Sequence, residues 1–210
     1  MKTNHFGFVI KYIMFLLDKD YWEIKETENK GRGVFAKKSI RQATVIGDYV
    51  GKLVHLKDVD FEAEKRNLYL MYYTDEVGIY PNLKKPGIHL INHSCSPNCW
   101  MIRLKNHTIV FALKKIKKGS ELTISYLLPP KMNCSPCNHN CFCKSKNCTG
   151  SMHLTESGYK KWQEFQDKES KKDMFKTKKL AGELKPLKEC PRVSKKLISE
   201  IKALQKEMHQ

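Results

Sequence analysis

Residues 90–99 read LINHSCSPNC, and this short stretch decides how the rest of the chain is interpreted. Polar side chains are unusually dense here for a loop flanked by leucine and isoleucine. Asn92 and His93 can hold hydrogen-bond donors and acceptors in a fixed geometry, and Cys95 could ligate a metal ion. A single histidine is more often a structural residue than a ligand, but these neighbours favour a functional site.

Two further motifs lie on either side of this stretch. Residues 119–126, GSELTISY, predict a turn and then a strand that ends in Tyr126. Residues 30–36, KGRGVFA, place Gly31 and Gly33 between predicted strands. Glycines let the backbone approach a ligand closely, but they also serve ordinary turns. The motif is not a dinucleotide-binding fingerprint, because the third glycine and the following helix are missing.

A fourth motif is the C-x-C-x4-C pattern of residues 141–148, CFCKSKNC. Three thiols this close indicate zinc, but they are one ligand short of a closed tetrahedral site, so the fourth must come from elsewhere. Cys134 and Cys137 form an additional C-x2-C pair. With Cys99 and His139 nearby, this pair could build a second metal site, but spare thiols are the favoured interpretation.

The composition restricts the class of protein. The 210 residues include 39 Lys and Arg against 22 Asp and Glu, a formal net charge of +17. This length predicts one domain with room for a tail. A hydrophobic share of 40% excludes wholesale disorder, and no apolar run reaches the roughly 18–20 residues of a transmembrane segment. The positive excess implies an acidic partner: nucleic acid, anionic lipid or an acidic protein.

Residues 7–17, GFVIKYIMFLL, are the one stretch that looks like a targeting signal. Lys11 interrupts it and no small-residue cleavage site follows, so a helix or strand packed against the body is favoured over a cleaved signal peptide. We expect an intracellular location, cytoplasmic or else nuclear in a eukaryote or after delivery to a host. In a reducing compartment, clustered cysteines are more often metal ligands than disulfides.

Short strands dominate the predicted secondary structure up to Tyr126. The predicted strands are residues 45–54, 100–104, 108–113 and 122–124, with a hairpin at residues 105–107. Residues 62–72 are the best helix candidate in this half, although their end could equally be a strand.

The chain becomes rich in lysine and helical beyond residue 155. Tyr159, Trp162 and Phe165 suit one face of a helix. An apolar stripe of Val193, Leu197, Ile201 and Leu204 predicts an amphipathic helix over residues 191–208. The favoured interpretation is a solvated basic tail that docks through this stripe. Lys195, Lys196, Lys202 and Lys206 would remain available for nucleic acid or another acidic partner.

The order KGRGVFA, NHSCSPNC, GSELTISY and C-x-C-x4-C resembles the SET-domain protein-lysine N-methyltransferases with a post-SET cysteine motif. The similarity covers roughly residues 21–152. It implies a mostly β fold with some α, made of several small β-sheets around a pseudoknot. The expected segments are an N-terminal apolar segment (1–20), the SET domain (21–130), a cysteine-rich post-SET segment (131–152) and a basic helical C-terminal region (153–210).

The resemblance also implies roles for individual residues. S-adenosylmethionine would be held by the backbone at Gly31, Arg32 and Gly33, and by Asn92, His93 and Tyr126. Tyr126 would sit beside the transferred methyl group as the catalytic residue. Zn2+ would be bound by Cys95, Cys141, Cys143 and Cys148, which supplies the missing fourth thiolate.

Methyl transfer to lysine explains why such a site is needed. A lysine amine with a pKa of about 10.4 must lose its proton before it attacks, which costs roughly 4–5 kcal/mol at neutral pH. A narrow apolar channel and the cofactor's positive charge both favour the neutral amine. Tyr126 is suited to orient that amine and to stabilise charge at the transferring methyl. Tyr49, Tyr72 and Tyr73 are candidate channel walls, although each could instead be core.

Two positions depart from the family pattern. The family usually has Asn-x-x-Arg-Phe before NHSC, where this chain has residues 86–90, PGIHL. Ser125 stands where the family often has aspartate before the tyrosine. Neither change removes a group that the chemistry needs.

Two functions from different classes follow. The leading hypothesis is a protein-lysine methyltransferase whose substrate is a histone or another basic protein presenting a lysine. The alternative is a non-catalytic, zinc-stabilised SET-like scaffold whose basic tail binds nucleic acid or chromatin. Intact cofactor motifs and Tyr126 favour the enzyme.

Overall fold

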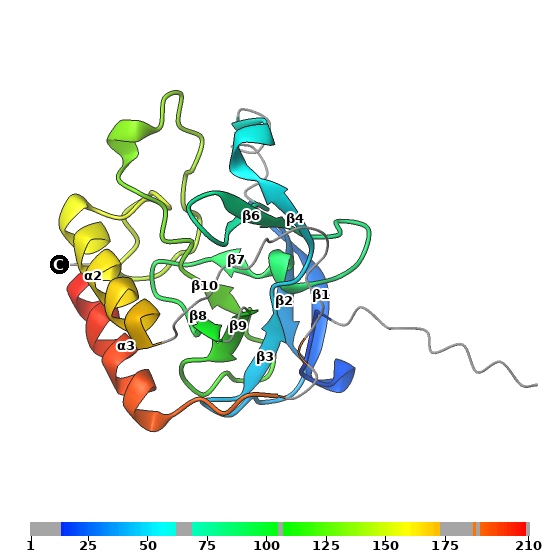
Figure 1. Cartoon of the computed structure of the whole chain (residues 1–210). Coiled ribbons are helices and arrows are strands. Elements are labelled where there is room, and N and C mark those ends of the chain that lie inside the picture. The colour runs from blue at the N-terminus through cyan, green and yellow to red at the C-terminus, as the bar shows by residue number, and fades with distance from the viewer. Residues whose placement is uncertain (1–13, 62–68, 105–106, 173–186, 188–189, 209–210) are drawn as a thin grey trace, which may run out of the picture.

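The computed structural model describes residues 14–61, 69–104, 107–172, 187 and 190–208. In this part of the chain, ten short strands form four small sheets, and two longer helices pack beside them (Figure 1). The mostly β fold predicted for a SET domain is therefore confirmed. No helix in the described ranges is both long and apolar enough to cross a membrane.

The central sheet has the order β3-β9-β8 and is antiparallel throughout. Its strands are β3 (Val45–Asp48), β9 (His107–Ala112) and β8 (Cys99–Leu104). Alternate residues of β9 belong to two different apolar cores: Val110 and Ala112 to one, Ile109 and Phe111 to the other. Both faces of this sheet are therefore covered, which explains why residues 109–112 of β9 are all apolar.

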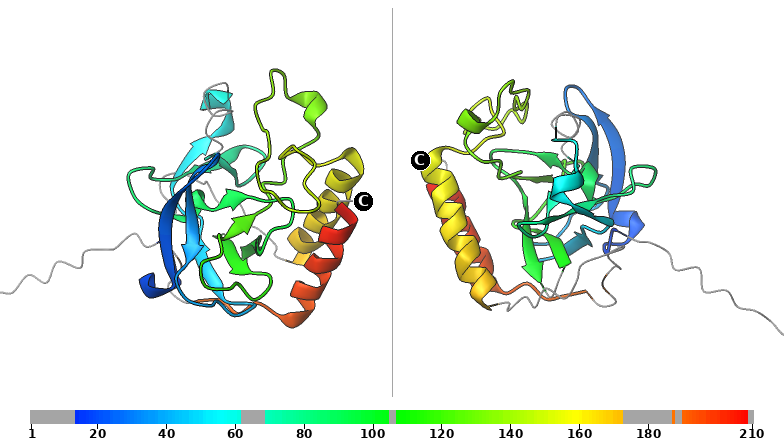
Figure 2. Two further views of the ribbon diagram at one scale, coloured as in Figure 1. Left: turned by 180° about the vertical axis from the view of Figure 1, so that it is seen from behind. Right: turned by 45° about the horizontal axis from the view of Figure 1, so that its top comes forward.

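Two helices cover one face of this sheet. They are α2 (Glu156–Lys172) and α3 (Lys195–Met208), which lie side by side (Figure 2). The start of α2 contacts the end of α3: a Cβ added to Gly158 would lie 2.4 Å from the Met208 carbonyl oxygen. Ile201 is fully buried in this contact and packs in one cluster with Trp100 and Phe111.

The predicted C-terminal stripe therefore docks on the body, as expected. The helix begins at Lys195 rather than at residue 191. Ser194 explains this boundary, because its hydroxyl accepts a hydrogen bond from the Leu197 amide, which is the contact of an N-cap. Lys195, Lys196, Lys202 and Lys206 are exposed.

Two smaller antiparallel sheets lie on the other side of the central sheet. One pairs β1 (Trp22–Thr27) with β2 (Gly31–Ala36). The other has the order β4-β6-β5, from β4 (Lys52–His55), β6 (Val77–Tyr80) and β5 (Met71–Tyr72). Residues 62–68 of the helix candidate lie outside the described part of the chain, and the end of that candidate is strand β5.

The prediction of one strand over residues 45–54 needs correction, because the structure divides it between β3 and β4. Gly51 lies between the two strands, and a Cβ there would come within 2.2 Å of the Tyr80 carbonyl oxygen. The chain leaves the central sheet at this close approach and joins β6 in another sheet. The predicted hairpin of residues 100–113 is confirmed as the β8–β9 pair.

The N-terminal apolar stretch is described only from Met14 onward. Phe15 is buried and stacks on Trp22 with ring centroids 3.8 Å apart, while the Asp48 amide donates to the Met14 carbonyl. The described end of this stretch therefore packs against the body. The rest of it, residues 7–13, lies outside the described residues.

The fourth sheet brings the two most informative motifs together. β7 (Asn92–His93) pairs in parallel with β10 (Thr123–Ile124), with Asn92 opposite Thr123 and His93 opposite Ile124. Asn98 fastens the loop after β7 to the same segment, because its side chain donates to the Glu121 carbonyl at 2.7 Å and accepts from the Thr123 amide at 2.9 Å. The NHSC and tyrosine motifs therefore form one structural unit.

Candidate functional site

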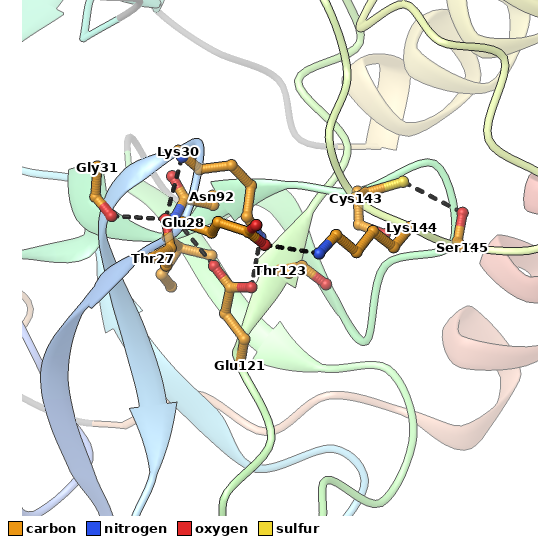
Figure 3. Close-up of polar contacts among 12 residues, drawn as sticks. Thr27, Glu28, Lys30, Gly31, Asn92, Glu121, Thr123, Cys143, Lys144 and Ser145 are labelled. Carbon is orange, nitrogen blue, oxygen red and sulfur yellow. Dashed lines mark hydrogen bonds and ion pairs between the residues drawn. The ribbon is translucent and has the colours of Figure 1, made fainter.

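The glycine motif forms the start of β2 and lies beside Asn92. The Asn92 side-chain amide donates to the Arg32 carbonyl at 3.2 Å and to Glu121 Oε1 at 2.9 Å. Lys30 forms an ion pair with the other oxygen of Glu121 (Figure 3). The turn before Gly31 is held by Thr27, whose hydroxyl donates to the Gly31 carbonyl at 2.6 Å. Motifs about sixty residues apart therefore share one hydrogen-bonded network.

Gly33 shows how tightly this network is packed. A Cβ at this position would lie 2.8 Å from Glu121 Oε1 and 2.9 Å from Asn92 Nδ2. These distances are shorter than a carbon atom tolerates, so only glycine fits without displacing one of the two side chains. Gly31 has a different role, since it adopts a positive φ of 65° at the end of the β1–β2 turn.

Glu121 is the residue of this network that the sequence did not single out, although it stands within the GSELTISY motif. Its place is determined by neighbouring backbone bonds: the Ala36 amide donates to the Ser120 carbonyl, and the Leu122 amide to the Val34 carbonyl. Its side chain is only 17% exposed, and the paired Lys30 side chain is 15% exposed. A largely buried carboxylate of this kind needs its two partners, Asn92 and Lys30, to balance the loss of water contacts.

His93 connects Tyr126 with Cys95. Its Nδ1 accepts a hydrogen bond from the Tyr126 backbone amide at 3.1 Å, and its Nε2 lies 3.6 Å from Cys95 Sγ. Because Nδ1 acts as an acceptor, the neutral ring carries its proton on Nε2, where it faces the sulfur. The ring also meets Tyr126 edge-on, with centroids 5.4 Å apart.

The Tyr126 hydroxyl is turned toward the chain before β7. It donates to the Ile91 carbonyl at 3.4 Å, which is a long hydrogen bond. Burial raises the pKa of Tyr126, and nearby Tyr69 and the negative charge of Glu121 act in the same direction. The hydroxyl therefore keeps its proton at neutral pH and can serve as a hydrogen-bond donor and acceptor.

The four expected metal-binding cysteines lie together. The sulfurs of Cys95, Cys141, Cys143 and Cys148 are all within 4.8 Å of one another, and those of Cys95 and Cys141 are 3.7 Å apart. Two sulfurs bound to one tetrahedral zinc at about 2.3 Å would be separated by about 3.8 Å. The donor set and spacing therefore fit Zn2+.

The surroundings of Cys143 favour its thiolate. Burial alone would raise its pKa, but hydrogen bonds from Ser145 and the Cys95 backbone lower the pKa of Cys143 to about 6. The Ser145 hydroxyl lies 3.2 Å from Cys143 Sγ (Figure 3). Metal ligation needs the thiolate, which Cys143 therefore favours, whereas burial raises the pKa of Cys95 and of Cys141.

The cysteine segment reaches the glycine turn. Lys144, with a positive φ of 54°, directs its ammonium to Glu28 in the β1–β2 turn, and the ion pair spans 2.7 Å (Figure 3). The hydrogen bond and charge of Lys144 lower the pKa of Glu28. Both side chains are exposed, so this ion pair contributes little to stability. It does show that the cysteine segment and the β1–β2 turn lie next to each other.

The three candidate channel tyrosines lie in different environments. Tyr49 is buried, and its hydroxyl donates to the Tyr69 carbonyl at 2.6 Å. Tyr73 is fully buried; its carbonyl accepts from Arg103, and burial raises the pKa of its phenol to about 12. Tyr72 is 59% exposed. Tyr73 is therefore a core residue, and Tyr72 is not.

Two residues at the positions that depart from the family pattern, Ser125 and His89 of the PGIHL segment, are both buried. Ser125 accepts a hydrogen bond from the Leu127 amide at 3.4 Å. His89 packs edge-on against Tyr69, and neither of its ring nitrogens has a hydrogen-bond partner within the described ranges. Burial lowers the pKa of His89 to about 4, and the charge of Arg32 adds to this effect. His89 is therefore neutral at physiological pH.

The comparisons with known proteins agree with this geometry. Residues 31–127 match the family model described as SET domain. The chain is 33% identical over 150 residues to the variant-silencing SET domain-containing protein of Plasmodium falciparum, covering 65% of this chain and 6% of that protein.

Other relatives are named histone-lysine N-methyltransferases. One is trithorax of Drosophila melanogaster, 29% identical over 139 residues, covering 62% of this chain and 4% of that protein. Another, described as H3 lysine-36 specific, is from Mycosarcoma maydis, 31% identical over 143 residues, covering 62% of this chain and 14% of that protein. The chain thus spans a small part of the length of these relatives.

Proposed function

Because the chain contains a SET domain and a cysteine cluster that fits the post-SET zinc motif, we propose that it transfers a methyl group from S-adenosylmethionine to the ε-amine of a protein lysine. One observation carries this proposal. Neighbouring residues Asn92 and His93 hold the glycine strand on one side, through the Arg32 carbonyl, and the Tyr126 backbone on the other. The cofactor motifs and the tyrosine are therefore next to each other.

The residues expected to hold the cofactor are those of the glycine turn, with Asn92, His93 and Tyr126. S-adenosylmethionine supplies an electrophilic methyl group on a positively charged sulfur. Asn92 and Glu121 keep the β2 backbone in place, and the absence of a side chain at Gly33 lets both of them pack directly against that backbone. Placing the two reactants in line is the main contribution that such a site makes to the rate.

Tyr126 is the residue that we assign to the reacting amine. Its raised pKa keeps the phenol neutral, so the hydroxyl can accept a hydrogen bond from the amine without competing for its proton. Its weak contact with the Ile91 carbonyl can be given up when a substrate binds. The phenol oxygen then stabilises positive charge near the transferring methyl.

We assign one Zn2+ to Cys95, Cys141, Cys143 and Cys148. Its role is structural, because all four positions are protein thiolates and no position is left open for catalysis. Cys95 belongs to the loop after β7 and the other three to the post-SET segment, so the ion joins the two. The expected effect is to hold the post-SET segment beside the glycine turn, where Lys144 meets Glu28.

The proposed methyl acceptor is a lysine in a histone or another basic protein, in an intracellular and, in a eukaryote, nuclear setting. Its identity rests on the names of the relatives. A direct test incubates the purified protein and labelled S-adenosylmethionine with core histones and, separately, with a whole-cell protein extract. We expect label on lysine with the wild type and far less with Tyr126→Phe. Failure to bind S-adenosylmethionine in calorimetry would contradict the proposal and favour a non-catalytic scaffold.

Nucleic-acid contact is a second proposal, supported by the four exposed lysines of α3. Removing the helix would uncover Trp100 and Phe111, so the test should change its charges and keep the fold. Changing Lys195, Lys196, Lys202 and Lys206 to Gln should weaken binding to duplex DNA and reduce its dependence on salt. Unchanged affinity and an unchanged salt slope would exclude these lysines as the contact.

A further inference from the structure

A second group of metal-binding side chains lies in the post-SET segment, apart from the four cysteines already described. It consists of Cys134, Cys137, His139 and His153, whose ligand atoms are all within 4.8 Å of one another. The favoured interpretation of the sequence was that Cys134 and Cys137 are spare thiols, and the alternative was a second metal site with Cys99 and His139. His139 does belong to the group, but Cys99 does not. Cys99 is fully buried in the core, where its thiol lies 3.3 Å from Asn98 Oδ1, and His153 completes the group instead.

The distances within this group fit tetrahedral ligation by two sulfurs and two nitrogens. His139 Nδ1 lies 3.5 Å from Cys134 Sγ and 3.9 Å from Cys137 Sγ. His153 Nε2 lies 3.4 Å from Cys137 Sγ and 2.9 Å from His139 Nδ1. For a zinc ion with bonds of about 2.3 Å to sulfur and about 2.0 Å to nitrogen, a sulfur and a nitrogen would be about 3.5 Å apart and the two nitrogens about 3.3 Å apart. The three sulfur–nitrogen distances lie close to the first value, and the two nitrogens are somewhat closer together than the second.

The tautomer of His153 is also the one that a metal ligand needs. Its Nδ1 bonds to the Pro129 carbonyl, and because a carbonyl can only accept, Nδ1 must carry the proton. The lone pair of Nε2 is then directed at Cys137 and His139. A histidine that binds a metal through one ring nitrogen usually donates the N–H of the other nitrogen to a carboxylate, a backbone carbonyl or water. This hydrogen bond is evidence independent of the clustering itself.

Backbone contacts hold the four ligands in place. His153 bridges Leu128 in parallel, and the Leu154 amide donates to the Leu128 carbonyl at 3.0 Å. The Met152 amide donates to the His139 carbonyl at 2.9 Å. These backbone bonds bring His139 and His153, which lie in different stretches of the chain between β10 and α2, close to each other.

We propose that Cys134, Cys137, His139 and His153 bind a second Zn2+, in a closed structural site with two sulfur and two nitrogen ligands. On binding, both thiols give up their protons to solvent and both imidazoles remain neutral. The ion joins the first part of the post-SET segment to His153, which lies just before α2. Since residues 141–148 lie between His139 and His153, it also fixes both ends of the stretch that supplies three of the other four cysteines.

The test is the zinc content and ligand set of the purified full-length protein, measured by metal analysis and X-ray absorption at the zinc edge. We expect about two zinc ions per chain, with nitrogen at about 2.0 Å contributing beside sulfur at about 2.3 Å. About one ion per chain with sulfur ligands alone would overturn the proposal. Neither measurement depends on methyl transfer, so its outcome is separate from that of the proposed function.

Variants assign each ion to its ligands. Cys137→Ser should lose about one ion and the nitrogen contribution, whereas Cys143→Ser should lose about one ion and increase the nitrogen share of what remains. Cys190→Ser is the matched control, because Cys190 is exposed and belongs to neither group; it should retain both ions. Two ions in Cys137→Ser would refute the assignment. If Cys137→Ser does not fold, the number of zinc ions per wild-type chain and their ligand atoms still test the proposal.

Discussion

Tyr126 and His93 are joined by a hydrogen bond in which the Tyr126 backbone amide donates to the imidazole Nδ1. The opposite nitrogen of the same ring faces Cys95, one of the four clustered cysteines. A single buried imidazole therefore stands between the tyrosine and the cysteine cluster. Movement of Cys95 would be transmitted to the backbone that carries the Tyr126 ring, so we expect the two sites to depend on each other.

Replacing Tyr126 by Phe should lower methyl transfer by about 10²–10³-fold while the affinity for S-adenosylmethionine changes little. The hydroxyl's hydrogen bond to the Ile91 carbonyl is a long one, so its loss should cost little stability. Single-turnover methylation and calorimetry would measure the two effects separately. Tyr159→Phe is the control, because Tyr159 lies on α2 and packs in the other apolar cluster, away from Tyr126. Near-normal turnover in Tyr126→Phe would remove the role assigned to Tyr126.

Replacing Cys143 by Ser should remove about one zinc ion and weaken cofactor binding. Loss of the ion would release Cys95, and through His93 it would disturb the Tyr126 backbone. Metal analysis with calorimetry on the same sample would check both effects. An unchanged zinc content would show that Cys143 is not a ligand. Unchanged cofactor affinity after zinc loss would show that the metal does not support the cofactor site.

Replacing Gly33 by Ala should weaken the binding of S-adenosylmethionine by about tenfold or more, because the added methyl displaces Glu121 or Asn92 at a cost of about 1–3 kcal/mol. Lys25→Ala is the matched control. Lys25 lies directly opposite Gly33 on β1, and its side chain is 49% exposed. Equal affinities in the two variants would show that the Asn92–Glu121 contact does not shape the cofactor site.

His89 should make the fold sensitive to acid. Its pKa is lowered from 6.5 to about 4 in the folded protein, so below pH 6.5 the unfolded chain takes up a proton that the native state refuses. Stability should fall as the pH decreases from 6.5 toward 4, by about 2 kcal/mol after allowance for solvent screening. His89→Leu should flatten this part of the profile, measured by urea unfolding at several pH values. Parallel profiles would argue against His89 as the cause.

Replacing Ile201 by Ala should reduce the free energy of unfolding by about 2–5 kcal/mol, because the side chain is fully buried between α3 and the central sheet. Lys202→Ala, at the next and exposed position, should change it by less than about 0.5 kcal/mol. Denaturant unfolding of the two variants gives the comparison. Similar values for both would mean that α3 is not part of the cooperative fold.

Much of the local structure follows from the sequence, because it depends on residues close together in the chain. The spacing of apolar residues identified α3 and its buried face, and two runs rich in β-branched and aromatic residues identified the β8–β9 hairpin. The C-x-C-x4-C pattern identified three clustered thiols for the same reason, since so short a segment keeps its cysteines within reach of one ion.

Contacts between residues that are far apart in the sequence could be identified only from the tertiary structure. Glu121 joins Lys30 across 91 positions, and no local pattern marks that pair. His153 replaced Cys99 as the partner of Cys134 and Cys137, because β8 carries Cys99 into the apolar core while the Leu128–His153 bridge brings His153 back to the segment. Spacing along the sequence determines which side chains can meet within one turn or hairpin. The packing of separate sheets and loops determines which side chains from distant parts of the sequence come into contact.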